Sequence, residues 1–407
     1  MGLSIRQRWM VLLAGAALTV GTAAACSGGG GGQPVVATGT AFSCLLDDSQ
    51  VYCWGANSSG QLGIGGLPDS VPMKSDPVEL GAEAVDVAAG DRHACAVTAD
   101  GTVYCWGSNS AGQLGGGTTV EHSRIPVKVL DIDNAVGVAL GWKHSCAVLD
   151  NGGARCWGLN TSGQLGNGKF GHDENAYEPQ VVGGLRDVVQ LAAGEALTCA
   201  VTSEHEVYCW GTDFQGRTSI EDIGVPNLAR PTLIEGLPGR ALSVGAGRSF
   251  ACALVDDGKV YCWGFNQFAE LGKGEANMEG TAFPIPQEVI GIDGEVLRLA
   301  IGSTHSCAAT SNDVFCWGTN LFGQLGALSD ELCFGDPCHP SAVLVEPLEG
   351  RNGLVSIDAA YGHTCAAFRD GDVTCWGRNS AGALGDGTDV DSLDPVTVVD
   401  GRSTSDR

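Results

Sequence analysis

The sequence predicts an all-β fold, a seven-bladed β-propeller made of four-stranded antiparallel blades. The tripeptide Cys-Trp-Gly recurs seven times, at successive spacings of 52, 51, 53, 53, 54 and 59 residues. Each repeat contains four short apolar segments separated by turns, which is typical of a propeller blade. Long helical periodicity is absent, which argues against helical solenoids of similar period. The tripeptides begin at Cys53, Cys105, Cys156, Cys209, Cys262, Cys316 and Cys375.

The four expected strands follow one order in every repeat. An apolar strand ends in Ala-Ala-Gly or a variant, as in residues 85–90, 188–194 and 296–302. A second strand carries a cysteine, and a turn containing glycine leads to a third strand that ends in Cys-Trp-Gly. The closing strands are expected to begin at Pro77, Pro126, Pro179, Pro231, Pro286, Pro340 and Pro395. The repeats cover residues 34–401, as 34–83, 84–134, 135–186, 187–239, 240–294, 295–352 and 353–401.

Residues 1–25 have the pattern of an export signal. Arg6 and Arg8 precede an apolar run over residues 9–20, and three alanines lead to Cys26. A membrane-spanning helix needs about 20 apolar residues, so this run is too short to serve as one.

The residues around Cys26 resemble the lipobox and flexible tether of bacterial lipoproteins. Three alanines precede Cys26, and Ser27 and five glycines follow it. The resemblance implies that Cys26 is lipidated, that residues 26–33 form a tether, and that Ser27 directs the protein to the outer membrane, facing the periplasm or the cell surface. The alternative is an Ala-x-Ala cleavage site, simple secretion and an unmodified Cys26. Residues 402–407 form a tail.

The composition excludes some partners. Lys and Arg total 22 against 47 Asp and Glu, for a net charge of −25, which becomes −27 if Arg6 and Arg8 leave with the signal. Such a surface repels nucleic acid and anionic lipid. We therefore expect a monomer without a cofactor that contacts the membrane only through a lipid anchor.

The cysteines predict disulfides between adjacent strands. In the second repeat, Cys95 and Cys105 flank a three-residue loop, Ala99-Asp100-Gly101. Counting outward from the hydrogen-bonded pair Thr98/Thr102 places the cysteines at a non-hydrogen-bonded site, where Cα atoms lie about 4.5 Å apart. The first and sixth hairpins are one residue shorter, which implies two-residue loops. The same counting again places their cysteines opposite each other at a non-hydrogen-bonded site.

All sixteen cysteines after Cys26 find a local partner, which fits export into an oxidising compartment. Cys333 and Cys338 with His339 leave zinc binding as an alternative to a disulfide. The expected pairs are Cys44/Cys53, Cys95/Cys105, Cys146/Cys156, Cys199/Cys209, Cys252/Cys262, Cys307/Cys316, Cys333/Cys338 and Cys365/Cys375.

The repeat resembles that of the regulator of chromosome condensation family. It combines Gly-x-x-His-x-Cys-Ala, Asp-Gly-x-Val-Tyr-Cys-Trp-Gly, Asn-x-x-Gly-Gln-Leu-Gly and Pro-x-x-Val over about residues 34–401. Gly-Gln-Leu-Gly stands complete at residues 60–63, 112–115, 163–166 and 323–326, whereas the fourth repeat departs with Gly216-Arg217-Thr218-Ser219. The fifth and seventh repeats keep Leu271-Gly272 and Leu384-Gly385. The resemblance implies a seven-bladed propeller, and the cysteine pairs resemble exported bacterial members.

The recurring aromatic residues and histidines predict packing rather than chemistry. One tryptophan stands at the same position of every repeat, as a repeating core requires, although an aromatic binding site is the alternative. His93, His144, His305 and His363 share a position that Phe42, Leu197 and Phe250 occupy in the other repeats. A position that accepts Phe or Leu needs bulk rather than a proton.

No set of residues stands out as catalytic, and no metal site is expected beyond the zinc alternative. Residues 98–101 resemble sialidase Asp-boxes only superficially, and residues 141–145 resemble the Trp-rich motif of the plant ultraviolet-B photoreceptor but occur once. The family's nuclear exchange factor acts on a small GTPase that an exported chain would not meet, so exchange activity is disfavoured.

Function is expected where the repeats differ. The variable loops are residues 168–178, 212–227, 275–283 and 327–340, and neutral drift in exposed loops is the alternative. In the last loop, Phe334, Asp336 and His339 are the candidate binding residues, because a Cys333/Cys338 bridge would lower the cost of ordering them. We expect a non-enzymatic exported lipoprotein that recognises an envelope or extracellular protein or glycan. The alternatives are a secreted inhibitor of an extracellular enzyme and a propeller hydrolase or lyase.

Overall fold

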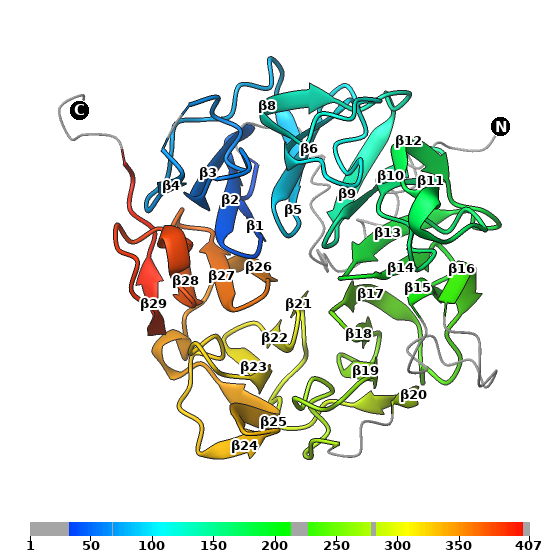
Figure 1. Ribbon diagram of the computed structural model, residues 1–407. Coiled ribbons are helices and arrows are strands. Elements are labelled where there is room, and N and C mark those ends of the chain that lie inside the picture. The colour runs from blue at the N-terminus through cyan, green and yellow to red at the C-terminus, as the bar shows by residue number, and fades with distance from the viewer. Residues whose placement is uncertain (1–31, 67, 213–226, 278–281, 402–407) are drawn as a thin grey trace.

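Seven antiparallel sheets stand around one axis in the computed structural model, which describes residues 32–66, 68–212, 227–277 and 282–401 (Figure 1). Each sheet is built from strands that are contiguous in sequence, with the first strand nearest the axis, and in six of the seven sheets the last strand lies at the rim. The predicted seven-bladed propeller is therefore confirmed. The expected signal peptide, Cys26 and the tail at 402–407 lie outside the described residues.

The strands nearest the axis are β1 (Val35–Thr38), β5 (Ala84–Ala89), β9 (Ala135–Leu140), β13 (Val188–Ala193), β17 (Ala241–Ala246), β21 (Arg298–Ile301) and β26 (Leu354–Ala359). The second strands are β2 (Phe42–Asp47), β6 (His93–Thr98), β10 (His144–Leu149), β14 (Leu197–Thr202), β18 (Phe250–Val255), β22 (His305–Ala309) and β27 (His363–Phe368). Most second strands are buried along their whole length, because neighbouring blades cover both faces.

The third strands are β3 (Gln50–Ala56), β7 (Val103–Ser108), β11 (Ala154–Gly158), β15 (Val207–Thr212), β19 (Val260–Gly264), β23 (Val314–Thr319) and β28 (Val373–Gly377). The fourth strands are β4 (Ser70–Val71), β8 (His122–Lys128), β12 (Ala176–Val181), β16 (Asn227–Leu233), β20 (Phe283–Glu288), β25 (Asp336–Leu344) and β29 (Ser392–Thr397). Short 3-10 turns are η1 (His172–Glu174), η2 (Glu346–Leu348) and η3 (Ser380–Gly382).

The expectation that a proline begins each closing strand is wrong. In blades two to seven the proline lies inside the fourth strand, as Pro126 does in β8, and in the first blade Pro77 forms only an isolated bridge with Tyr52. A rim strand needs no N–H donor on its outer side, so it tolerates proline. The register also shifts opposite this strand, between Cys105 and Gly107 in the second blade.

The sixth blade departs from the expected four strands. Its sheet has the order β21-β22-β23-β25-β24, so that β24 (Glu331–Cys333) forms a fifth strand at the rim. Strand β24 pairs antiparallel with the first residues of the long strand β25. This blade therefore extends farther from the axis than its neighbours by one short strand.

The cysteine hairpins follow the expected geometry. The seven pairs that join second and third strands face each other directly, with Cα atoms 4.0 to 4.1 Å apart. In the first hairpin Asp48 and Ser49 both have positive φ, which suits a two-residue loop. In the second, Thr98 N–H donates to Thr102 O at 2.9 Å and Gly101 takes a φ of 84°, as a three-residue loop requires.

The ring closes without exchanging a strand between blades. Strand β29 completes the sheet of the seventh blade, and β1 begins the sheet of the first, so the C-terminal strand does not pair with residues near Val35. At this junction Asp358 Oδ2 accepts hydrogen bonds from Thr38 N at 2.7 Å and Thr38 Oγ1 at 2.9 Å. Lys74 and Asp400 form an isolated bridge nearer the rim.

Within the part of the chain that the structure describes, no helix is long and apolar enough to span a membrane.

Candidate recognition surface

Most junctions between blades are held by a recurring contact. In the third blade, Ser145 Oγ and Trp157 Nε1 both donate to Gln113 O of the second blade, each at 2.9 Å. His93 Nε2 of the second blade lies 2.9 Å from the same Ser145 Oγ. Because Ser145 gives its proton to Gln113, its oxygen accepts from His93. The conserved geometry therefore fastens one blade to the next.

The four aligned histidines all take part in this contact and are fully buried. Burial lowers their pKa values from 6.5 to about 3 for His93 and His305 and about 4 for His144 and His363, because a buried imidazolium loses its hydration. They are neutral structural groups at physiological pH. The pairs are His93 with Ser145, His144 with Thr198, His305 with Thr364 and His363 with Ser43.

The aligned tryptophans are buried in the same junctions. All seven have no exposed surface, so none is available to a ligand. Five of them donate an indole N–H, each at 2.9 Å, to a backbone carbonyl of the preceding blade. These donors are Trp54, Trp106, Trp157, Trp210 and Trp317.

Three buried carboxyl groups also contribute to the scaffold. Burial raises the pKa values of Asp86 and Glu270 to about 7 and that of Asp358 to about 6. Asp86 Oδ2 accepts from Val138 N at 2.9 Å across a junction, and Glu270 Oε2 accepts from Phe268 N at 2.8 Å. Perturbed carboxyls can mark catalytic sites. Here each of the three carboxyls accepts a hydrogen bond from a backbone N–H group, so they act as structural links.

The disulfide-bonded loop of the sixth blade lies on the rim. Cys333 and Cys338 are bonded and buried, and they flank the turn of the hairpin formed by β24 and β25. Phe334, at the tip, has a φ of 54° and is 49% exposed, and its ring centroid lies 6.1 Å from that of Phe268. The bond between the two sulfur atoms leaves no thiolate for the zinc alternative.

The other two candidate residues have different settings. His339 Nε2 lies 2.8 Å from Leu328 O, and the carbonyl can only accept, so the ring donates and holds the loop. Asp336 begins β25 and is partly exposed. Of the three candidate binding residues, Phe334 presents its side chain at the surface, whereas His339 holds the backbone of the loop at Leu328.

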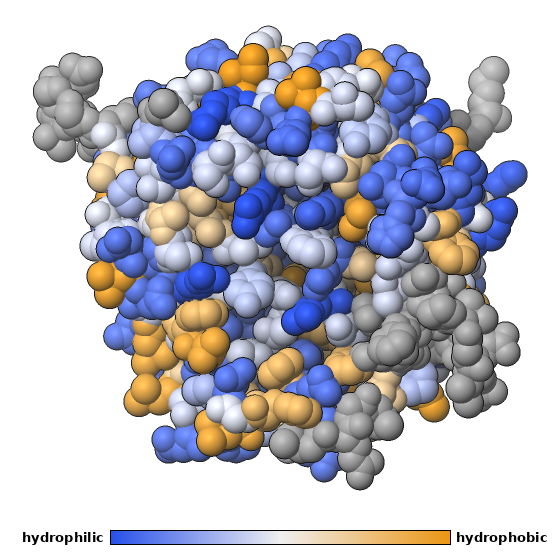
Figure 2. All heavy atoms as spheres, viewed as in Figure 1, coloured by the Kyte–Doolittle hydropathy of each residue, from blue (hydrophilic) through white to orange (hydrophobic). Residues whose placement is uncertain are grey.

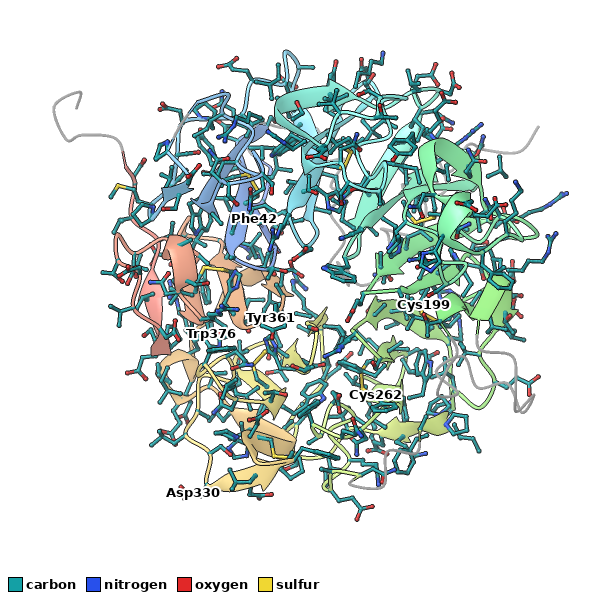
Figure 3. All side chains as sticks on the ribbon, in the orientation of Figure 1. Phe42, Cys199, Cys262, Asp330, Tyr361 and Trp376 are labelled. Carbon is teal, nitrogen blue, oxygen red and sulfur yellow. A yellow bond between two sulfur atoms is a disulfide. The ribbon has the colours of Figure 1, made fainter. Side chains whose placement is uncertain are left out.

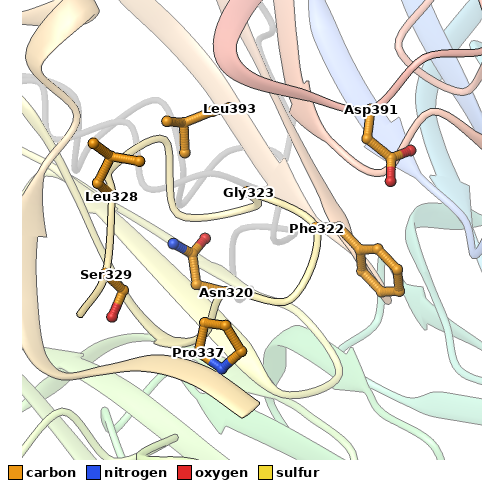
Figure 4. Close-up of a pocket in the computed structure, with 8 residues that line it drawn as sticks. All are labelled: Asn320, Phe322, Gly323, Leu328, Ser329, Pro337, Asp391 and Leu393. Carbon is orange, nitrogen blue, oxygen red and sulfur yellow. The ribbon is translucent and has the colours of Figure 1, made fainter. Parts of the chain in front are cut away.

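A shallow hollow of about 300 Å³ lies beside this loop, between the sixth and seventh blades (Figure 4). The sixth blade contributes most of its wall, and Asp391 and Leu393 come from the seventh blade. Sequence reasoning missed this site, because it joins residues from two repeats. The signal in the sequence is the set of large apolar residues Leu321, Phe322 and Leu328 in the outer loop of the sixth repeat. The lining residues are Asn320, Phe322, Gly323, Leu328, Ser329, Pro337, Asp391 and Leu393.

Two exposed aromatic residues stand at equivalent positions between the first and second strands of their blades. Trp142 of the third blade lies beneath Lys143 Nζ at 5.0 Å. Tyr361 of the seventh blade lies 5.7 Å from the Arg378 guanidinium, which also covers Phe322 at 5.0 Å. Figure 3 shows Tyr361 beside the axis and Asp330 at the outer edge of the sixth blade. Aromatic residues therefore extend from the axis to the hollow.

The remaining variable loops show fewer features of a binding site among the described residues. Residues 168–178 contain η1 and an ion pair of 3.1 Å between Lys169 and Glu174. Residues 213–226 and 278–281, in two other variable loops, lie outside the described residues. No group of three or more His, Cys, Asp or Glu residues within the described ranges is arranged to hold a metal ion.

The chain matches models of one protein family. Residues 32–307 match the model described as an RCC1-like domain, and residues 296–324, 354–383 and 311–367 match those described as the regulator of chromosome condensation (RCC1) repeat.

Similar proteins include parts of much longer chains. The human E3 ubiquitin-protein ligase HERC2 is 32% identical over 350 residues, which cover 83% of this chain but only 7% of the ligase. The Arabidopsis thaliana ultraviolet-B receptor UVR8 is 29% identical over 385 residues, covering 91% of this chain and 83% of the receptor. The mouse secretion-regulating guanine nucleotide exchange factor is 31% identical over 372 residues, covering 86% and 78%.

Among solved structures, Prp20p from Saccharomyces cerevisiae has a TM-score of 0.76 at 22% identity, covering 86% of each chain. At that identity the likeness shows a shared fold.

Proposed function

Because the chain belongs to the regulator of chromosome condensation (RCC1) family, we propose that it is a non-enzymatic, exported propeller scaffold that recognises a protein or glycan at the cell envelope. One observation carries the proposal. The contacts between blades recur around the ring, whereas the sixth blade alone among the described sheets adds a fifth strand and a further disulfide. Variation confined to exposed loops on a rigid scaffold is typical of recognition surfaces.

Export is supported by the eight disulfides, because such bonds persist in oxidising compartments. In our proposal Cys26 carries a lipid that anchors the protein in the outer membrane. The exchange activity in the name of the mouse relative is not part of the proposal, since an oxidising compartment holds none of the small GTPases of the cytosol.

Mass spectrometry of the mature amino terminus tests the anchor. A diacylglyceryl group on Cys26 is expected in protein purified from the membrane of an exporting bacterium. The Cys26→Ser variant should move to the soluble fraction with its propeller intact. A mature chain that carries a free Cys26 thiol would contradict the anchor and leave simple secretion.

Site-specific photo-crosslinking tests recognition. A crosslinking amino acid at Phe334 should capture an envelope component in intact cells, whereas the same group at the exposed Val120 of the second blade serves as the matched control. Capture of one dominant enzyme would indicate the inhibitor alternative. Equal or absent capture at both positions would contradict recognition through the sixth blade.

A further inference from the structure

We propose that the hollow between the sixth and seventh blades, together with the disulfide-bonded loop, binds a basic amphipathic peptide segment of a partner protein. The inference rests on the recognition function proposed above and names the chemical class of the partner. We refer to the hollow, lined by Phe322, Leu328 and Asp391 among others, together with the exposed loop residues Leu332 and Phe334, as the rim groove.

The rim groove is unusually apolar for an exposed loop. Leu321, Leu328, Leu332 and Phe334 are 51%, 82%, 66% and 49% exposed. Figure 2 shows apolar residues gathered over the part of the ring that the sixth blade occupies in Figure 1. A cluster of large exposed apolar side chains is costly in water and typical of a binding surface.

The two blades approach each other closely at the groove. Gly323 takes a φ of 81°, and a Cβ at this residue would lie 3.0 Å from Leu393 Cα. A larger residue would therefore separate the sixth blade from β29. Leu328 stands on one side of the hollow, and Phe322 and Asp391 stand on the other (Figure 4).

The groove is held in shape by bonds that do not depend on a ligand. Asn320 N–H donates to Pro337 O at 2.7 Å, and Asn320 Nδ2 donates to Ala327 O at 2.7 Å. His339 donates to Leu328 O, and Ser329 Oγ donates to Cys338 O. With the disulfide, these bonds order the loop before binding, which lowers the entropic cost of recognition.

Apart from Arg378, whose guanidinium lies over Phe322, the charge around the groove is negative. Residues 321–344 and 379–401 contain no Lys or Arg and eight Asp or Glu residues. Asp330, Glu331, Asp389 and Asp391 are exposed, and none of them belongs to an ion pair among the described residues. Asp391 Oδ1 accepts from Asn379 N at 2.7 Å, which fixes the direction of its carboxylate.

These features select one kind of occupant. Apolar side chains flanked by unpaired carboxylates complement a segment that alternates apolar residues with Lys or Arg. A second copy of the chain would bring the same acidic rim and a net charge of −25, so self-association is opposed. A neutral glycan would leave the carboxylates without counter-charges. The guanidinium of Arg378 over Phe322 already shows that a ring of this groove accepts a cation on its face.

Binding of a fluorescent Leu/Lys amphipathic peptide to the full disulfide-bonded protein, followed by fluorescence anisotropy, tests the inference. Leu328→Ser with Leu332→Ser should weaken binding by about tenfold or more, because these side chains would be buried by the peptide. Asp330→Asn with Asp391→Asn should weaken it by about fivefold, and the affinity of the wild type should fall as salt rises. Asparagine at position 391 keeps an oxygen that can accept from Asn379.

Matched controls separate the groove from the charge of the whole protein. Val120→Ser with Ile125→Ser removes two apolar residues of the second blade that are 63% and 59% exposed, and Glu79→Gln with Asp133→Asn removes two exposed acids elsewhere. Both should leave affinity unchanged. Peptides with Gln in place of Lys, or Ser in place of Leu, should bind about tenfold more weakly or worse. Unfolding curves of every variant should match that of the wild type.

Several results would overturn the inference. Equal binding by the groove variants and the controls would show attraction to the net charge alone, and equal binding of the Gln peptide would exclude a basic partner. If no peptide binds but crosslinking at Phe334 captures a glycan, this inference fails and the recognition function stands. If crosslinking at Phe334 also captures nothing, both fail.

Discussion

The second and sixth blades share a scaffold and differ at the rim. In both, a buried asparagine begins the outer loop, and its Oδ1 accepts from the backbone N–H five residues later, at 3.0 Å from Leu114 to Asn109 and at 3.1 Å from Leu325 to Asn320. The second blade then continues into β8, whereas the sixth inserts β24 and a disulfide. The comparison shows that new surface was added after the conserved turn, outside the contacts that hold the ring.

Replacing a tryptophan of the scaffold should have the largest effect. Trp106 is fully buried and donates to Gln61 O, so Trp106→Ala is expected to lower the free energy of unfolding by about 3–5 kcal/mol. Urea unfolding with intact disulfides measures the loss. Leu332→Ala on the rim should change stability by no more than about 0.5 kcal/mol, and an effect there as large as that of Trp106 would break the distinction between scaffold and rim.

The next largest effect should be a difference in stability between removing a hairpin disulfide and removing the rim disulfide. Replacing Cys95 and Cys105 by serine removes a buried hairpin link, and we expect a loss of about 2–3 kcal/mol. Replacing Cys333 and Cys338 should cost less stability, because they join two rim strands, but should reduce crosslinking at Phe334. Differential scanning calorimetry and the crosslinking assay together check this. A larger stability loss at the rim pair would contradict the comparison.

Replacing a histidine of the contacts between blades should have an effect on stability of intermediate size. His93→Phe should cost about 1–3 kcal/mol, because a larger ring must replace a hydrogen bond to Ser145. Adding Ser145→Ala should recover part of the loss, since the first two blades already pair Phe42 with Ala94 at these positions. A double-mutant cycle measures the coupling. Additive losses would show that the two residues do not act together.

Glu270 should give a smaller, pH-dependent effect. Its pKa is raised from 4.5 to about 7 by burial, so the folded chain binds the proton more tightly than the unfolded chain. This contribution to stability is complete below about pH 4.5 and is lost as the pH rises through 7. Glu270→Gln should therefore stabilise the protein by about 1–2 kcal/mol at pH 8 and have little effect at pH 4. Thermal unfolding at both pH values checks this, and an equal effect at both would contradict it.

The buried histidines act in the opposite direction, because their pKa values are lowered. Their contribution is complete above about pH 6.5 and is lost as the pH falls towards 3 to 4. The Glu270 comparison should therefore be made between the variant and the wild type at each pH, so that the histidine effect cancels.

Local features of the fold were predictable from the sequence. The disulfide Cys95–Cys105 follows from counting residues around one hairpin, because the two cysteines and the turn between them lie within eleven residues of sequence. The seven blades follow from the repeat of Cys-Trp-Gly. These predictions need no knowledge of how one blade meets the next.

Features that depend on contacts between blades were not predictable in the same way. Asp391 and Leu393 meet the sixth blade only because β29 lies beside its turn. His93 pairs with the polar Ser145, and Phe42 pairs with the apolar Ala94. Both pairs are present in the sequence, but they become visible only when the second strands of neighbouring blades are aligned. The expectation that β8 starts at Pro126 is wrong, because this proline is an internal residue of a rim strand that begins at His122.

The closure of the ring has a consequence for how such chains can change. Since every sheet is contiguous in sequence and the first and seventh blades meet only through lateral contacts, all seven seams are topologically alike. A gene that begins at any seam would encode the same sheets in a permuted order. Duplication or deletion of one whole unit would sever no sheet, so this architecture can gain or lose sectors by simple recombination.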